Sequence, residues 1–86
     1  MYYVYILEKY IDKTWYIGYT SDLRKRLSDH NNGKGCKTTK NCKSWKIIYY
    51  EAYLDKEDAT SREIFLKSGS GHKFIHKQLS HYLKKL

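Results

Sequence analysis

An arginine and a histidine lie beside two leucines in the segment YIGYTSDLRKRLSDH, residues 16–30. On a helix with about 100° between residues, Leu23 and Leu27 lie within about 40° of each other. Arg26 and His30 fall just beside them, so the helix turns an anion-binding cation and a proton-transferring imidazole toward its core face. A partly buried guanidinium is costly unless it is paired. Its partner is either an external anion or a carboxylate of the fold, and the helical wheel leaves both open.

A single acid lies on the apolar face of the second predicted helix. Ala59, Glu63 and Leu66 share that face, which is aimed at the core that Arg26 approaches. The carboxylate of Glu63 is either a structural partner for Arg26 or Arg62, or a ligand for a hard divalent cation whose other ligands are waters.

Composition and period predict the elements that must position these residues. Their order is ββαβαα: strands at YYVYIL and WYIGY, a helix from Ser21 or Asp22 to about Asn31, a strand at KIIYYEAY, a helix from Asp55 to about Gly69, and a helix from His72 onward. The simplest α+β arrangement is a small, largely antiparallel three-stranded sheet flanked by helices.

Two strand tyrosines are candidates for the same site. If the loop of the first hairpin has an even number of residues, Tyr5 and Tyr16 lie on one face of the sheet, and an odd loop would part them. The chain has ten tyrosines, so most of them are expected to serve packing.

The charge balance indicates a polyanionic partner. The chain has 17 Lys and Arg against 9 Asp and Glu, a net charge of +8. One acid, Asp29, accompanies eight basic residues between Arg24 and Lys46, and no acid follows Glu63. Such a field is the usual electrostatic signature of nucleic-acid binding, although some basic domains use it on anionic lipid or for solubility.

Length and hydropathy exclude several classes of protein. The 86 residues suit one domain, residues 1–86, with a compact single-layered core. The longest apolar run is far shorter than the ~18 residues of a membrane-spanning helix, and the N-terminal segment lacks the pattern of a signal peptide. These features predict a cytoplasmic protein in which Cys36 and Cys42 are free thiols, because their spacing matches a zinc site only weakly.

Five polar residues follow one another along the chain with a distinctive spacing. A tyrosine in YVY is followed eleven places later by a tyrosine that opens YIG, then by an arginine ten places on, a histidine four further and a glutamate on a downstream helix. This series resembles the GIY-YIG nuclease family, in particular its small stand-alone bacterial branch. The matching residues are Tyr5, Tyr16 with Gly18, Arg26, His30 and Glu63. The resemblance extends from Tyr2 to about Leu79, and Tyr3 stands where the family has its first glycine.

The resemblance implies a phosphodiesterase with one metal ion, Mg²⁺ or Mn²⁺, held by Glu63 next to the scissile phosphate. Arg26 would bind the phosphate oxygens. Tyr5 is the favoured general base, Tyr16 would orient water or phosphate, and His30 would steady Tyr5 or relay its proton. Which of these three takes the proton stays open.

The resemblance also implies a nucleic-acid substrate, with DNA favoured and RNA not excluded. The basic residues expected to contact its backbone are Arg24, Lys34, Lys37, Lys40, Lys43, Lys46, Lys67 and Lys73. No base-reading module is present, so we expect recognition of branched, nicked or single-stranded DNA, in repair or recombination. Whether a separate protein partner adds specificity is left open, as are two other functions: a non-catalytic nucleic-acid-binding domain, and a basic interaction subunit for an acidic partner.

Overall fold

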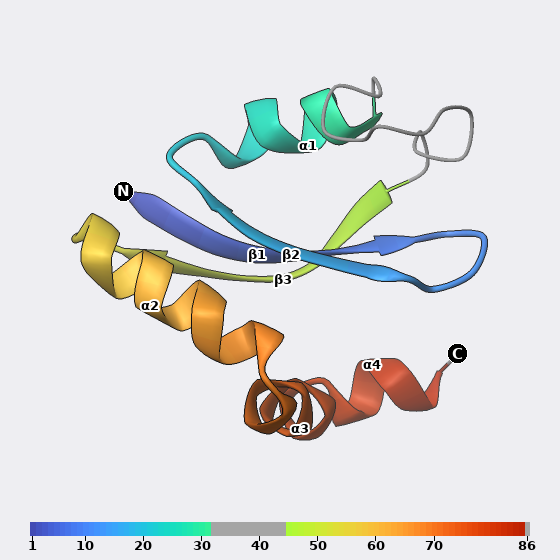
Figure 1. The fold of residues 1–86 in the computed structure, drawn as a ribbon. Coiled ribbons are helices and arrows are strands. Elements are labelled where there is room, and N and C mark those ends of the chain that lie inside the picture. The colour runs from blue at the N-terminus through green and yellow to red at the C-terminus, as the bar shows by residue number, and fades with distance from the viewer. Residues whose placement is uncertain (32–44, 86) are drawn as a thin grey trace.

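The computed structural model describes residues 1–31 and 45–85, whose elements follow the predicted order ββαβαα (Figure 1). The one difference in order is that the last predicted helix, from His72 onward, is broken at Leu79 into two helices. The strands are β1 (Tyr2–Lys9), β2 (Trp15–Thr20) and β3 (Trp45–Tyr53). The helices are α1 (Leu23–Asn31), α2 (Lys56–Lys67), α3 (Gly69–Gln78) and α4 (Ser80–Lys84). No helix within these ranges is long and apolar enough to cross a membrane.

The boundary between the second and third helices differs from the prediction. The second helix ends at Lys67 rather than near Gly69, and the third begins at Gly69 rather than at His72. The cause is Ser68, whose backbone is extended and whose Oγ accepts the backbone N–H of Gly71 at 3.1 Å. A serine that accepts from the first turn is a favourable N-cap, so a new helix starts at once.

The strands form an antiparallel sheet in the order β2-β1-β3. In the hairpin, Tyr5 pairs with Gly18 and Leu7 pairs with Tyr16. The last pair of the hairpin is Glu8 with Trp15, and residues 9–14, an even number, connect them. Because side chains alternate along a strand, Tyr5 and Tyr16 therefore lie on the same face. Their ring centroids are 6.3 Å apart.

Helices cover both faces of the sheet, with α1 on one face and α2, α3 and α4 on the other (Figure 1). The central strand β1 is buried on both sides, so its residues join two separate clusters. Val4 and Ile6 pack with residues of α2 and α3, whereas Tyr5 and Leu7 pack with residues of α1. The prediction of a single-layered core is therefore wrong. The run YVYIL lacks polar alternation, and such a strand has both of its faces to bury.

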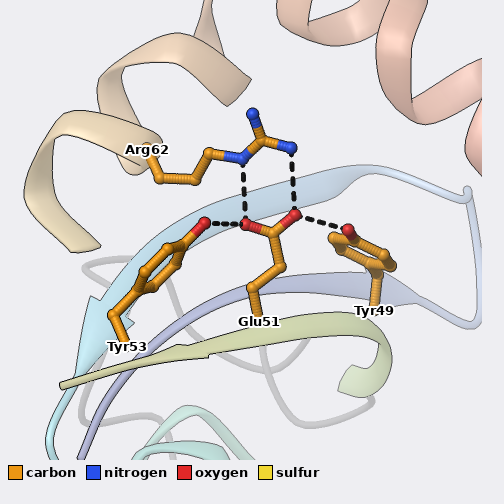
Figure 2. A network of polar contacts seen from close by, with 4 residues as sticks. All are labelled: Tyr49, Glu51, Tyr53 and Arg62. Atoms are coloured by element: carbon orange, nitrogen blue, oxygen red, sulfur yellow. Dashed lines mark hydrogen bonds and ion pairs between the residues drawn. The ribbon is translucent and has the colours of Figure 1, made fainter. Parts of the chain in front are cut away.

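A polar network holds α2 against β3 (Figure 2). The guanidinium of Arg62 donates from Nε to Glu51 Oε1 at 2.9 Å and from Nη2 to Oε2 at 3.0 Å, and the hydroxyls of Tyr49 and Tyr53 donate to the same carboxylate. Burial acts to raise the pKa of Glu51, but these donors outweigh it and lower that pKa. Burial and the carboxylate raise the pKa of Tyr49 and Tyr53 to about 12, so both phenols stay protonated donors. Arg62 is thus engaged by Glu51 and not by its neighbour Glu63.

Candidate active site

Three predicted side chains meet on the face of the sheet that α1 covers. Arg26 Nε donates to the hydroxyl of Tyr5 at 3.2 Å. The same hydroxyl lies 3.4 Å from Nε2 of His30, whose side chain is 1% exposed. Tyr16 completes the group, with its ring centroid 4.5 Å from that of His30. The partner of Arg26 is therefore a tyrosine hydroxyl, and the carboxylate that the helical wheel left open is not among its hydrogen-bond partners in the described residues.

Gly18 makes room for this cluster. A Cβ built on Gly18 would lie 2.7 Å from Tyr5 Oη and 3.1 Å from Tyr16 Cε1. Real Cβ atoms essentially never approach another atom as closely as the first of these distances. This glycine therefore permits the close approach of the two tyrosine side chains.

The protonation states of the cluster follow from its burial. Burial raises the pKa of Tyr5, and the hydrogen bond and charge of Arg26 offset only part of that rise. Burial also lowers the pKa of His30, and the charge of Arg26 lowers it further. At neutral pH the phenol is therefore protonated and the imidazole is neutral. Since Arg26 can only donate, the phenolic proton is free to point at His30 Nε2, which then acts as the acceptor.

Helix α2, which carries Glu63, covers the face of the sheet opposite α1, which carries Arg26 (Figure 1). The prediction that both approach one core is wrong, because Ala59 and Leu66 of the same helix face pack into the cluster opposite α1 (Figure 1). The Glu63 side chain is 19% exposed and its Oε2 lies 3.0 Å from Lys67 Nζ. Its charge nevertheless contributes to the raised pKa of Tyr5, so the carboxylate lies within electrostatic range of the phenol. Among the described residues, therefore, no hydrogen bond or ion pair joins Glu63 to the cluster, and its influence on Tyr5 is electrostatic.

One cleft lies beside Arg26, and another lies beside Tyr16 and Lys67. One of about 390 Å³ adjoins Arg26 and is lined by Thr20, Ser21, Asp22, Lys25, Arg26 and Asp29. Another of about 280 Å³ lies at the edge strand β2 and is lined by Trp15, Tyr16, Ile17, Lys67 and His72. Tyr16 of the cluster and Lys67, the ion-pair partner of Glu63, therefore border the same opening.

The side chains of the site suit a metal ion that needs few protein ligands. Within the described ranges, no group of three or more His, Cys, Asp or Glu side chains is placed to hold a metal. A lone carboxylate such as Glu63 suits a hard cation that keeps several waters and takes substrate phosphate as a further ligand, as Mg²⁺ does. Such an ion would compete with Lys67 for Oε2 of Glu63.

The predicted nucleic-acid contacts have different surroundings. Lys34, Lys37, Lys40 and Lys43 lie outside the described residues. Arg24 is exposed and borders a cleft of about 320 Å³, and Lys73 is exposed on α3. Lys46 is engaged by other groups, with Nζ 3.9 Å from Glu8 Oε1 and 5.5 Å from the ring centroid of Tyr82.

One buried acid is absent from the residues predicted from the sequence. Glu8 is 0% exposed, and it accepts hydrogen bonds from Trp15 Nε1 at 2.9 Å and from the Tyr82 hydroxyl at 2.6 Å. An acid directly after the buried run VYIL of β1, paired in the hairpin with a tryptophan, is the signal that could have revealed it. Its partner Tyr82 lies on α4, which no local pattern connects to β1.

Comparison with known proteins matches this chain to one family. A family model described as the GIY-YIG catalytic domain matches residues 1–75, which contain all five residues of the predicted series. A UPF0213 protein of Streptococcus pyogenes serotype M3 is 49% identical over 65 residues, which cover 76% of this chain and 70% of the relative. A UPF0213 protein of Streptococcus pneumoniae serotype 4 is 48% identical over 65 residues, 76% of this chain and 65% of that protein. The solution NMR structure of a UPF0213 protein from Bacillus halodurans is 34% identical, with a TM-score of 0.55, and the match covers 91% of this chain and 85% of that one.

Proposed function

Because the chain belongs to the GIY-YIG family, a family of nucleases, we propose that it is a divalent-metal-dependent endonuclease that hydrolyses phosphodiester bonds in DNA. One observation carries the proposal: the hydroxyl of Tyr5 is held between Arg26 and His30 above Gly18. Hydrolysis of a phosphodiester needs such neighbouring groups, one to bind the phosphate and others to move a proton. The proposed substrates are branched, nicked or single-stranded DNA in repair or recombination.

The protonation states support one proton route. Tyr5 is a neutral phenol, so it takes a proton from the attacking water at Oη while it passes its own proton to His30 Nε2. His30 is neutral and can accept that proton. Arg26 stays charged, because hydrogen bonding to Tyr5 raises its pKa, and it stabilises the negative charge that grows on the phosphate oxygens.

The remaining residues of the series have supporting roles. Glu63 would hold one Mg²⁺ or Mn²⁺, and such an ion neutralises charge on the departing 3′ oxygen when it is bound. Tyr16 would orient the water or the phosphate, since its ring packs against His30 beside the cleft at β2. Exposed Arg24 and Lys73 would contact the DNA backbone, as would Lys67 once its ion pair with Glu63 opens.

Metal dependence and one pair of variants test the proposal. Purified protein is incubated with supercoiled plasmid, single-stranded DNA, flap DNA and single-stranded RNA in Mg²⁺, Mn²⁺ or EDTA. We expect cleavage only with metal, and we expect Glu63→Gln to abolish it while DNA binding in EDTA is retained. Glu57→Gln is the matched control, because Glu57 is an exposed acid on the same helix and should leave cleavage unchanged.

Three outcomes would contradict the proposal. Binding without cleavage in every metal would favour a non-catalytic nucleic-acid-binding domain. No affinity for any nucleic acid at low salt would favour a basic interaction subunit. Full activity of Glu63→Gln would remove the metal from Glu63.

A further inference from the structure

Two neighbouring clefts lie along the β1–β2 hairpin. The first, of about 280 Å³, begins at Tyr16 of the candidate active site and contains Trp15, Lys67 and His72. The second, of about 390 Å³, is lined by Glu8, Lys13, Trp15, His72, His76 and Leu83. Trp15 and His72 line both, so the clefts adjoin at these two side chains, and together they are here named the hairpin groove. Each part is comparable in volume with the smaller ligand pockets of proteins.

Trp15 presents a fixed aromatic surface in the hairpin groove. Its Nε1 donates to Glu8 Oε2 at 2.9 Å, and the fully buried Glu8 is held in turn by Tyr82, so the indole has a defined orientation. The ring centroids of His72 and His76 lie 6.1 and 5.3 Å from that of Trp15. The His76 ring is held as well, because its Nδ1–H donates to the backbone carbonyl of His72 at 2.9 Å. Aromatic side chains that are already ordered lose little conformational entropy when a flat ligand stacks on them.

The charges in the hairpin groove favour a ligand that carries phosphates. Lys67, which is ion-paired with Glu63 in this structure, lines the part next to Tyr16, and Lys13 lines the part next to α4. The single carboxylate of the lining, that of Glu8, is buried and engaged by hydrogen-bond donors. A nucleotide in a strand has a flat ring, which can stack on aromatic side chains, and a phosphate on either side of it, which can contact lysines.

We infer that the hairpin groove binds an unpaired nucleobase of the strand that is cleaved, stacked on Trp15 and His72, with the flanking phosphates near Lys67 and Lys13. The inference rests on the proposed function in that it places the scissile phosphate beside Tyr16. The base must be unpaired, because a base within a duplex has both of its faces stacked on its neighbours. Every base has a π-face, so this contact tolerates any sequence.

Binding without cleavage tests the groove directly. Fluorescence anisotropy in EDTA compares two end-labelled strands of equal length, an oligothymidylate and an abasic oligomer with the same phosphates. We expect the wild type to bind the oligothymidylate about tenfold more tightly, as one stacked base predicts. His72→Ala should weaken oligothymidylate binding about fivefold and leave binding of the abasic strand unchanged. The matched control is His81→Ala, because His81 is an exposed histidine on α4 that does not line the groove, and this change should alter neither affinity.

Equal affinity of the wild type for the two strands would overturn the inference, and so would equal affinities of the His72→Ala and His81→Ala proteins for the oligothymidylate. Cleavage assays with Mn²⁺ on the same preparations separate the two proposals. Cleavage without a preference for bases retains the nuclease and rejects the groove. A preference for bases that depends on His72, without cleavage in any metal, retains the groove and rejects the nuclease.

Discussion

Replacement of Gly18 by alanine tests whether the Tyr5 hydroxyl is the centre of the site. The added Cβ would lie 2.7 Å from Tyr5 Oη, whereas ordinary van der Waals contact begins near 3.4 Å. The hydroxyl must therefore retreat by about 0.7 Å, the difference between these distances. The same oxygen is 3.2 Å from Arg26 Nε and 3.4 Å from His30 Nε2, so a shift of this size disturbs both contacts.

The expected effects of Gly18→Ala fall on rate and on stability. A misplacement of about 1 Å at a reacting group costs about 10²-fold, so we expect the single-turnover cleavage rate to fall about 10- to 100-fold. The Tyr5 side chain is buried and has little space in which to move. Overpacking at this position should cost about 1–3 kcal/mol of unfolding free energy, and each kcal/mol lowers Tm by roughly 4–8 °C in a domain of this size. Quenched-flow cleavage and thermal melting followed by circular dichroism measure the two effects.

Gly69 provides the matched control. Nothing lies within 4 Å of a Cβ built on Gly69, so Gly69→Ala should keep the wild-type cleavage rate and should not lower Tm. A Gly18→Ala protein that cleaves at the wild-type rate would refute the placement of the Tyr5 hydroxyl at the centre of the reaction.

Three other predictions concern single groups. Tyr5→Phe removes the hydroxyl through which we propose that the attacking water is linked to His30, so cleavage should slow about 10²-fold or more with only a small change in Tm. An unchanged turnover would move the role of general base to His30 or Tyr16. The pKa of His30 is lowered in the folded state, so below about pH 6.5 the unfolded chain binds more protons than the folded one. The free energy of unfolding should therefore decrease as pH falls. Urea titrations at several pH values should show this slope reduced in His30→Gln and kept in His81→Gln. Arg62→Met leaves the Glu51 carboxylate without its ion pair and should lower the free energy of unfolding by about 1–3 kcal/mol, measured by urea titration. The loss caused by Arg62→Met should be smaller when Glu51→Gln is also present. Additive losses in the double variant would show that the two residues are not coupled.

Local patterns were sufficient for the part of the site that lies on neighbouring elements. The hairpin of β1 and β2 has a side-chain period of two, so the spacing of Tyr5 and Tyr16 placed them on one face once the loop parity was known. The helical period of α1 aimed Arg26 and His30 at the sheet, and α1 follows β2 directly, so they meet Tyr5. These relations cross short stretches of chain and depend on backbone geometry alone.

Long-range contacts were not predictable in the same way. A helical wheel gives the direction of Glu63 relative to its own helix axis, but not which face of the sheet α2 covers, and so it placed Glu63 and Arg26 in one core. The same limit applies to Arg62, whose carboxylate partner Glu51 is on a strand that precedes the helix. Both outcomes depend on how α2 docks, which the whole set of buried side chains decides together.

The sequence by itself therefore determined the types and spacing of the reactive groups and the order of the elements, whereas the strand register decided that the two tyrosines share a face. Only the tertiary structure decided that helices cover both faces of the sheet, that Arg26 rests on the hydroxyl of Tyr5, and that Trp15 is locked by the buried Glu8. The physical reason is that strand and helix periods are properties of the local backbone, whereas docking and burial are collective properties of side chains that are far apart in the chain.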